Sequence, residues 1–167
     1  MVLNETYQAC LVRRIVDNDQ VEALFALSSM IERIVDNDVE VCDYEITTSV
    51  GRNYKNPNCL QMQLKLAYEK RGKPCPAGTR VGYVVGKGEG NVAAKVIPAE
   101  FAEKSDVDRA WYLRNHLQST FVELFGLFGD TKVSCIHDLF VSAVNRLEAE
   151  EKGQMSIRSF FKRAKRW

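Results

Sequence analysis

Positively charged residues recur through the middle of the sequence, among residues whose side chains carry hydroxyl or amide groups. The cations are Arg52, Lys55, Lys65, Lys70, Arg71, Lys73, Arg80, Lys87 and Lys95. The polar residues beside them are Thr47, Thr48, Ser49, Asn53 and Tyr54. Side chains of these kinds bind the phosphates and sugars of nucleic acids without reading the base sequence. Ordinary solvated lysines fit the spacing equally well, so the spacing alone leaves both interpretations open.

No pattern typical of a hydrolytic, redox or metal centre accompanies these residues. His116 and His137 are the two histidines. Cys135 and His137 would offer two metal ligands, fewer than a zinc site requires. The acidic run at 148–151 is typical of a solvated helix face, not of the converging, partly buried carboxylates that hold two metal ions. We therefore assign no catalytic and no metal-binding residue, and we expect no cofactor in this chain.

The C-terminal segment carries a second pattern. Gln154, Ile157 and Phe160 are spaced three residues apart, and Phe161 follows directly. In a 3₁₀ turn, side chains at i and i+3 eclipse one another, so these three would share one face with Phe161 beside them. Each aromatic ring can bury ~150–250 Å². The alternative is a frayed amphipathic helix end whose two phenylalanines pack on the chain's own domain.

The pattern Gln-x-x-Ile-x-x-Phe-Phe resembles the peptide by which replication and repair proteins bind the sliding DNA clamp, proliferating cell nuclear antigen (PCNA). The resemblance implies reversible clamp binding through Gln154, Ile157, Phe160 and Phe161. The basic run at 162–166 is a weak signal for DNA contact or nuclear targeting.

The composition is that of an ordinary globular chain. With 167 residues, 46% hydrophobic and 27% charged, it suffices for one domain or one compact domain plus a tail. A net charge of +1 does not by itself indicate a nucleic-acid partner. The five cysteines form no Cys-x-x-Cys pair, which favours free thiols. No signal peptide and no apolar run of membrane-spanning length is evident, so we expect no membrane partner.

Hydrophobic periodicity predicts a mostly helical chain. The predicted helices cover residues 5–17, 20–35, 57–72, 105–128 and 132–151. Ser105 or Asp106 would cap the fourth. The sequence Arg-Ile-Val-Asp-Asn-Asp occurs at 14–19 and again at 33–38, and we interpret both copies as helix ends that leave through an Asp/Asn turn.

The remaining segments predict a small antiparallel sheet. Residues 44–48 form a plausible strand, and residues 81–85 and 92–96 read as a β-hairpin around the glycine-rich loop 86–90. A phosphate-binding loop would require a helix directly after these glycines, which the sequence does not predict. We therefore expect an α+β fold with a flexible C-terminal tail. The predicted domains are 1–130, a C-terminal helix at 131–152, and a clamp-binding peptide with a basic tail at 153–167.

Several short motifs follow one another in a definite order. They are Tyr44-Glu-Ile-Thr-Thr-Ser-Val50, Gly51-Arg-Asn-Tyr54, Gln61-Met-Gln-Leu-Lys-Leu-Ala-Tyr-Glu-Lys-Arg-Gly72, Gly78-Thr-Arg-Val-Gly-Tyr-Val-Val85 and Val107-Asp-Arg-Ala-Trp-Tyr-Leu113. In this order and spacing they resemble the thumb region of family B DNA polymerases, closest to the delta-like branch of eukaryotes and large DNA viruses. The resemblance extends from about Tyr7 to Gly129.

The sequence departs from that family in three respects. Thr48 stands where the family usually has Lys, which removes one expected DNA contact. The family's cysteine-rich C-terminal metal modules are missing, and the clamp peptide stands in their place. The metal-binding Asp-Thr-Asp and Ser-Leu-Tyr-Pro motifs of the palm, and the exonuclease motifs, do not occur. The resemblance therefore implies the C-terminal part of a DNA-directed DNA polymerase, as a fragment, a truncated reading frame or a split subunit, whose two Mg²⁺ ions belong to the missing palm.

The resemblance also implies what this part does. It would grip primer–template duplex through Thr47, Arg52, Asn53, Tyr54, Lys55, Lys65 and Arg80, and bind the sliding clamp (PCNA) through its C-terminus. Its further partner would be the remainder of the polymerase, in the nucleus or a viral replication compartment. One alternative is a free-standing clamp-binding adaptor of replication or repair. Another is a clamp-recruited enzyme such as a nuclease, which would need clustered acidic ligands.

Overall fold

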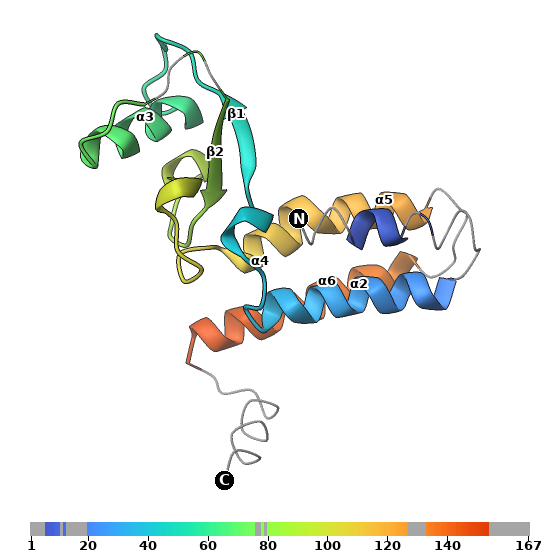
Figure 1. The fold of residues 1–167 in the computed structure, drawn as a ribbon. Coiled ribbons are helices and arrows are strands. Elements are labelled where there is room, and N and C mark those ends of the chain that lie inside the picture. The colour runs from blue at the N-terminus through green and yellow to red at the C-terminus, as the bar shows by residue number, and fades with distance from the viewer. Residues whose placement is uncertain are drawn as a thin grey trace. The chain divides into compact units, whose positions relative to one another are not determined.

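A computed structural model describes residues 6–10, 12, 20–75, 78, 80–126 and 133–153. The longer elements are α2 (Gln20–Val35), β1 (Ile46–Ser49), α3 (Leu60–Lys70), β2 (Arg80–Val85), β3 (Val96–Pro98), α4 (Arg109–Trp111), α5 (Gln118–Gly126) and α6 (Val133–Glu151). Short helical turns are η1 (Val41–Asp43), η2 (Val92–Lys95), η3 (Ala99–Phe101) and η4 (Tyr112–Leu117). Helices dominate beside one small antiparallel sheet, which confirms the predicted α+β class (Figure 1).

The chain forms two compact units. Residues 39–108 make up a unit that contains the sheet, and the segments before and after it make up a helical unit. The domain boundaries expected at 130 and 152 remain predictions. The clamp-binding residues Gln154, Ile157, Phe160 and Phe161 lie outside the described residues, as does the basic run at 162–166.

The sheet unit is built on three antiparallel strands in the order β1-β2-β3. In the register, Thr47 pairs with Gly82 and Ser49 with Arg80, while Tyr83 pairs with Pro98. Helix α3 packs against β3 and η2. The apolar core of the unit includes the buried side chains Tyr44, Val50, Leu64, Tyr68, Val81, Tyr83, Val84, Val85, Val96 and Val107.

The predicted hairpin is confirmed in its pairing but is wrong in its second strand. β2 pairs with Val96–Pro98, whereas residues 92–95 form the 3₁₀ turn η2. The side-chain oxygen of Asn91 accepts a hydrogen bond from the Ala94 amide at 3.0 Å, and this cap stabilises a helical turn there. Gly88 and Gly90 have φ angles of 134° and 102°, which explains why the loop between the strands needs glycine.

Two predicted helix starts are also wrong. The third helix begins at Leu60, because residues 56–58 form a turn in which the Asn56 side chain accepts from the Asn58 amide at 2.9 Å. The fourth begins at Arg109. Asp106 does not cap it, since its carboxylate accepts from the Glu103 amide at 2.9 Å. Both polar side chains satisfy a local turn instead of a helix end.

The helical unit has its core where α6 packs against α2 and α5 (Figure 1). Phe121 and Phe140 are both buried, with ring centres 6.2 Å apart, and the Tyr7 ring meets Phe121 edge-on at 5.9 Å. The predicted fourth helix is interrupted by η4, a π-helical segment in which the Gln118 amide donates to the Leu113 carbonyl five residues back.

The C-terminus of α2 confirms the predicted Asp/Asn turn at 36–38. Asn37 adopts a left-handed conformation with φ 58°. Its amide donates to Ile34 O at 3.2 Å and the Asp38 amide donates to Arg33 O at 2.8 Å, the two bonds of a Schellman motif. Arg109 Nη1 satisfies the last carbonyls by donating to Ile34 O (3.2 Å) and Val35 O (2.7 Å). The other copy of this sequence lies largely outside the described residues.

Candidate nucleic-acid interface

The structure places every residue predicted to contact DNA in the sheet unit. They come from four consecutive parts of it: β1, the connection at 50–59, α3 and the start of β2. These residues are Thr47, Arg52, Asn53, Tyr54, Lys55, Lys65 and Arg80. Whether they contact DNA remains a prediction.

One side of the β1–β2 pair is polar and exposed. Directly opposed residues of an antiparallel pair project from the same side of the sheet. The register therefore puts Thr47, Ser49 and Arg80 on one side, and all three are exposed. Thr48 projects from the other side, where its hydroxyl lies 3.5 Å from Gln61 Nε2 of α3. A residue at position 48 therefore faces away from the side that carries Thr47 and Arg80.

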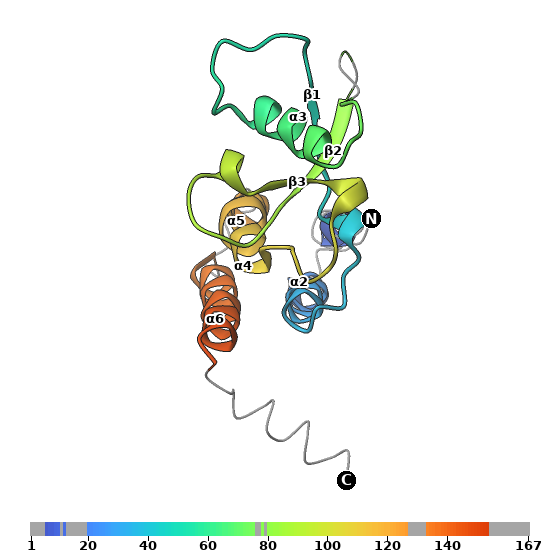
Figure 2. The same ribbon diagram turned by 90° about the vertical axis from the view of Figure 1, so that its left-hand side faces the viewer.

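The connection between β1 and α3 begins with a closed turn at 51–54, within the arch that joins the two elements in Figure 2. The Gly51 amide donates a hydrogen bond to the hydroxyl of Tyr54. Lys65 Nζ donates to the Arg52 carbonyl at 2.7 Å. Arg52 and Asn53 are exposed between these two anchors, and Lys55 is exposed directly after them.

Charge is unevenly distributed along the sheet unit. Between positions 50 and 88 the sequence holds eight Lys or Arg residues and one acidic residue, Glu69. Among the described residues, none forms an ion pair with Arg52, Lys55 or Arg80. Their positive charge, exposed and unpaired within the described ranges, can attract an anionic partner.

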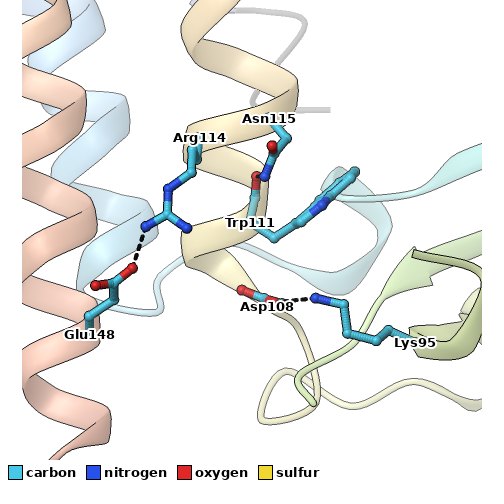
Figure 3. A network of polar contacts seen from close by, with 6 residues as sticks. All are labelled: Lys95, Asp108, Trp111, Arg114, Asn115 and Glu148. Carbon is cyan, nitrogen blue, oxygen red and sulfur yellow. Dashed lines mark hydrogen bonds and ion pairs between the residues drawn. The ribbon is translucent and has the colours of Figure 1, made fainter. Parts of the chain in front are cut away.

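Other cations of the unit are engaged in ion pairs. Lys95 Nζ lies 3.1 Å from Asp108 Oδ2, with both side chains mostly buried (Figure 3). Lys104 pairs with Glu40 at 2.5 Å. Lys95 is one of the recurring cations of the sequence, but its side chain is mostly buried within the unit.

A cluster around Phe101 engages two more of the sequence's cations. Arg71 Cζ and Lys73 Nζ lie 4.8 Å and 4.7 Å from the centre of the Phe101 ring. Lys73 also pairs with Glu100 at 3.0 Å. Burial and a hydrogen bond to Glu100 raise the pKa of the Tyr68 hydroxyl, and the same bond, followed by Lys73, lowers the pKa of the Glu100 carboxyl. Sequence spacing could not separate these packing cations from those available to a ligand.

The helical unit carries its own polar contacts (Figure 3). Arg114 pairs with Glu148, which is half-buried, whereas Glu150 and Glu151 of the same acidic run are exposed. Asn115 Nδ2 donates to the Trp111 carbonyl at 3.1 Å. His116 and His137 are both exposed. Within the described ranges, no three His, Cys, Asp or Glu side chains are grouped as metal ligands, and no helix is long and apolar enough to cross a membrane.

Comparison with known proteins gives a structural match without a sequence match. No protein-family model and no curated protein matches the sequence. Among solved structures, the family B DNA polymerase from the hyperthermophilic archaeon Pyrobaculum calidifontis is similar over 74% of this chain, with a TM-score of 0.60 and 19% sequence identity. The similar region is 17% of that polymerase. The chain thus shares its fold with part of a family B DNA polymerase and spans a minor share of its length.

Proposed function

We propose that this chain is the thumb-like part of a DNA polymerase and holds primer–template duplex beside an active site carried by another part of the enzyme. The observation that carries the proposal is the fold shared with part of a family B polymerase over 74% of the chain. The ordered motifs between Tyr44 and Leu113 support the same assignment. Under this proposal the described residues perform no bond-making step, and their contribution is binding.

The proposed DNA surface comprises the turn at 51–55 and the exposed side of β1 and β2. Arg52, Lys55 and Arg80 are exposed cations without an ion-pair partner among the described residues. Thr47 and Asn53 add exposed hydroxyl and amide groups beside them. Such groups bind the DNA backbone independently of base sequence, as a protein that follows a moving primer end requires.

The second part of the proposal concerns the C-terminus. Gln154, Ile157, Phe160 and Phe161 have the spacing of a sliding-clamp peptide. A short connection after α6 would convert clamp binding into a high local concentration of polymerase at the primer end. Processivity would rise without a change in chemistry. A delta-like polymerase acting in the nucleus or in a viral replication compartment is the setting that this combination favours.

Salt-dependent DNA binding tests the first part. The full chain is titrated with two duplexes of unrelated sequence, and the dissociation constant is measured between about 50 and 200 mM salt. We expect both duplexes to bind equally, with affinity falling steeply with salt. Each of Arg52→Ala, Lys55→Ala and Arg80→Ala should reduce the slope of log K against log salt by about 0.9.

Lys104→Ala is the matched control, because it removes one positive charge that is already paired with Glu40. It should leave the slope unchanged. If DNA binding did not respond to salt, or if the slope of log K against log salt were equal in the wild type and all three variants, this surface would be excluded as the DNA-binding surface.

A further inference from the structure

We infer that Tyr54 and Lys65 are positioning residues of this interface and not DNA contacts. The family resemblance implies that both contact DNA. In the structure each makes a hydrogen bond to the backbone of the turn at 51–54. The exposed residues Arg52 and Asn53 lie in this turn. The inference deepens the proposed function and rests on it: the ligand is the phosphodiester backbone, and these two residues fix the shape of the turn that meets it.

Tyr54 closes the turn from its C-terminal side. Its hydroxyl accepts a hydrogen bond from the Gly51 amide, so the side chain connects the two ends of the turn. Tyr54 is half-buried, while Arg52, Asn53 and Lys55 are exposed. A Cβ at position 51 would lie 3.3 Å from the Tyr54 hydroxyl oxygen, so a larger residue there would require the hydroxyl to move by a few tenths of an ångström.

Lys65 holds the same turn from α3. Its ammonium donates to the Arg52 carbonyl at 2.7 Å, across thirteen positions of sequence. Two neighbouring side chains of α3 fix the flanks of the turn: Gln63 Nε2 donates to Pro57 O at 3.0 Å, and Gln61 Nε2 lies 3.5 Å from Thr48 Oγ1. Side chains from the first half of α3 thus contact the connection at Arg52 and Pro57 and strand β1 at Thr48.

The physical consequence is preorganisation. A loop that must be ordered when a ligand binds loses conformational entropy at that moment, which weakens the affinity. A turn that is already fixed at both ends avoids this loss. Only the side chain of Arg52, and not its backbone, then has to be ordered when DNA binds. Removing either anchor should therefore weaken DNA binding while the number of phosphate contacts stays the same.

Double-mutant cycles on the full chain separate positioning from contact. DNA binding is measured for Tyr54→Phe, Lys65→Met, Lys65→Arg and Arg52→Ala, and for Tyr54→Phe and Lys65→Met each combined with Arg52→Ala. Tyr54→Phe and Lys65→Met should each weaken binding about three- to tenfold, the range of one net hydrogen bond, with an unchanged salt slope. Arg52→Ala should lower the slope by about 0.9. Lys65→Arg, which keeps a donor for the Arg52 carbonyl, should restore most of the affinity.

In the Arg52→Ala background, the effects of Tyr54→Phe and Lys65→Met should shrink to less than about twofold, because residues that act through a shared partner are not additive. A salt slope lowered by about 0.9 in Lys65→Met, with a fully additive effect, would make Lys65 a phosphate contact and overturn its positioning role. Unchanged affinity, or full additivity, in Tyr54→Phe would overturn the role of Tyr54. Circular dichroism melting of each variant identifies any loss of fold, and Tyr54→Phe and Lys65→Arg are conservative enough to keep it.

These outcomes are distinct from failure of the proposed function. In that case Arg52→Ala, Lys55→Ala and Arg80→Ala would themselves leave DNA binding unchanged. The positioning role of Lys65 fails separately, if those three variants lower the salt slope as expected and Lys65→Met lowers it by the same amount.

Discussion

Lys95 Nζ lies 3.1 Å from Asp108 Oδ2, and the two side chains are only 10% and 18% exposed. The pair joins Lys95 of η2 to Asp108. The preceding residue, Val107, forms an isolated β-bridge with Gly86. The Asp108 amide also donates to Val85 O at 3.0 Å. Asp108 thus binds the end of β2 through its backbone amide and the turn η2 through its side chain.

Removing one member of this pair should destabilise the sheet unit strongly. Lys95→Met leaves a mostly buried carboxylate without its cation, and we expect a loss of about 2–4 kcal/mol in the free energy of unfolding. Urea denaturation followed by circular dichroism measures it. Lys104→Met, which breaks the more exposed pair with Glu40, is the control and should cost less than about 1 kcal/mol. Equal effects of the two substitutions would contradict a special role for the buried pair.

Asn37 provides a test of the end of α2. Its φ of 58° lies in the left-handed region, which costs a residue with a Cβ about 1–2 kcal/mol and a β-branched residue the most. Asn37→Val should therefore lower the free energy of unfolding by about that amount, whereas Asn37→Gly should be neutral or slightly stabilising. Thermal and urea unfolding of both variants decide the question, and a destabilising glycine would show that the asparagine side chain matters more than the backbone conformation.

The Glu100 carboxyl should make the sheet unit sensitive to acid. Its pKa lies below the ordinary value of 4.5, first because of the hydrogen bond from Tyr68 and then because of Lys73. The contribution to stability is therefore fully present above about pH 4.5 and is lost as the pH falls through the lowered pKa. NMR titration of Glu100 measures this directly. Tyr68→Phe should raise the pKa of Glu100 toward 4.5, and more than Lys73→Met does; an unchanged pKa in Tyr68→Phe would contradict the assigned cause.

The C-terminal peptide gives a prediction that is independent of the sheet unit. A peptide covering 154–167 should bind a sliding clamp with micromolar affinity, because two aromatic side chains can fill an apolar pocket while ordering the segment offsets part of the gain. Calorimetry with purified clamp measures the affinity. Phe160→Ala combined with Phe161→Ala should abolish binding, and Ser159→Ala in the same peptide is the matched control.

Much of the fold could be predicted because several of its elements carry their own local signal. The apolar spacing in α2 and α6 and the turn residues around Asn37 depend on nearby sequence only. The π segment η4 could not be predicted, because its buried residues Leu113 and Leu117 are four apart and fit a regular α-helix equally well. The sequence predicts too early a start for β3 because Val92 and Val96 both favour a strand. The capping residue Asn91 is the sequence signal that separates the helical turn from the strand.

The candidate site was predictable in its location more than in its roles. Clustered Lys and Arg residues between positions 50 and 88 indicate the sheet unit, in which Arg52, Lys55 and Arg80 are exposed, and DNA binding there stays a prediction. Sequence spacing does not show which cation reaches a tertiary partner, however. Lys73 contacts Glu100 and Phe101, and Lys65 donates a hydrogen bond to the backbone carbonyl of Arg52. Both contacts depend on how the chain folds back on α3.

Arg109 has a consequence for protein engineering. By donating to the carbonyls of Ile34 and Val35, it binds the position where the chain departs from the helical unit to the position where it comes back. The two attachment points therefore sit side by side on one scaffold. We therefore expect that a short glycine–serine bridge could replace the segment 39–108, and that the helical unit would still fold.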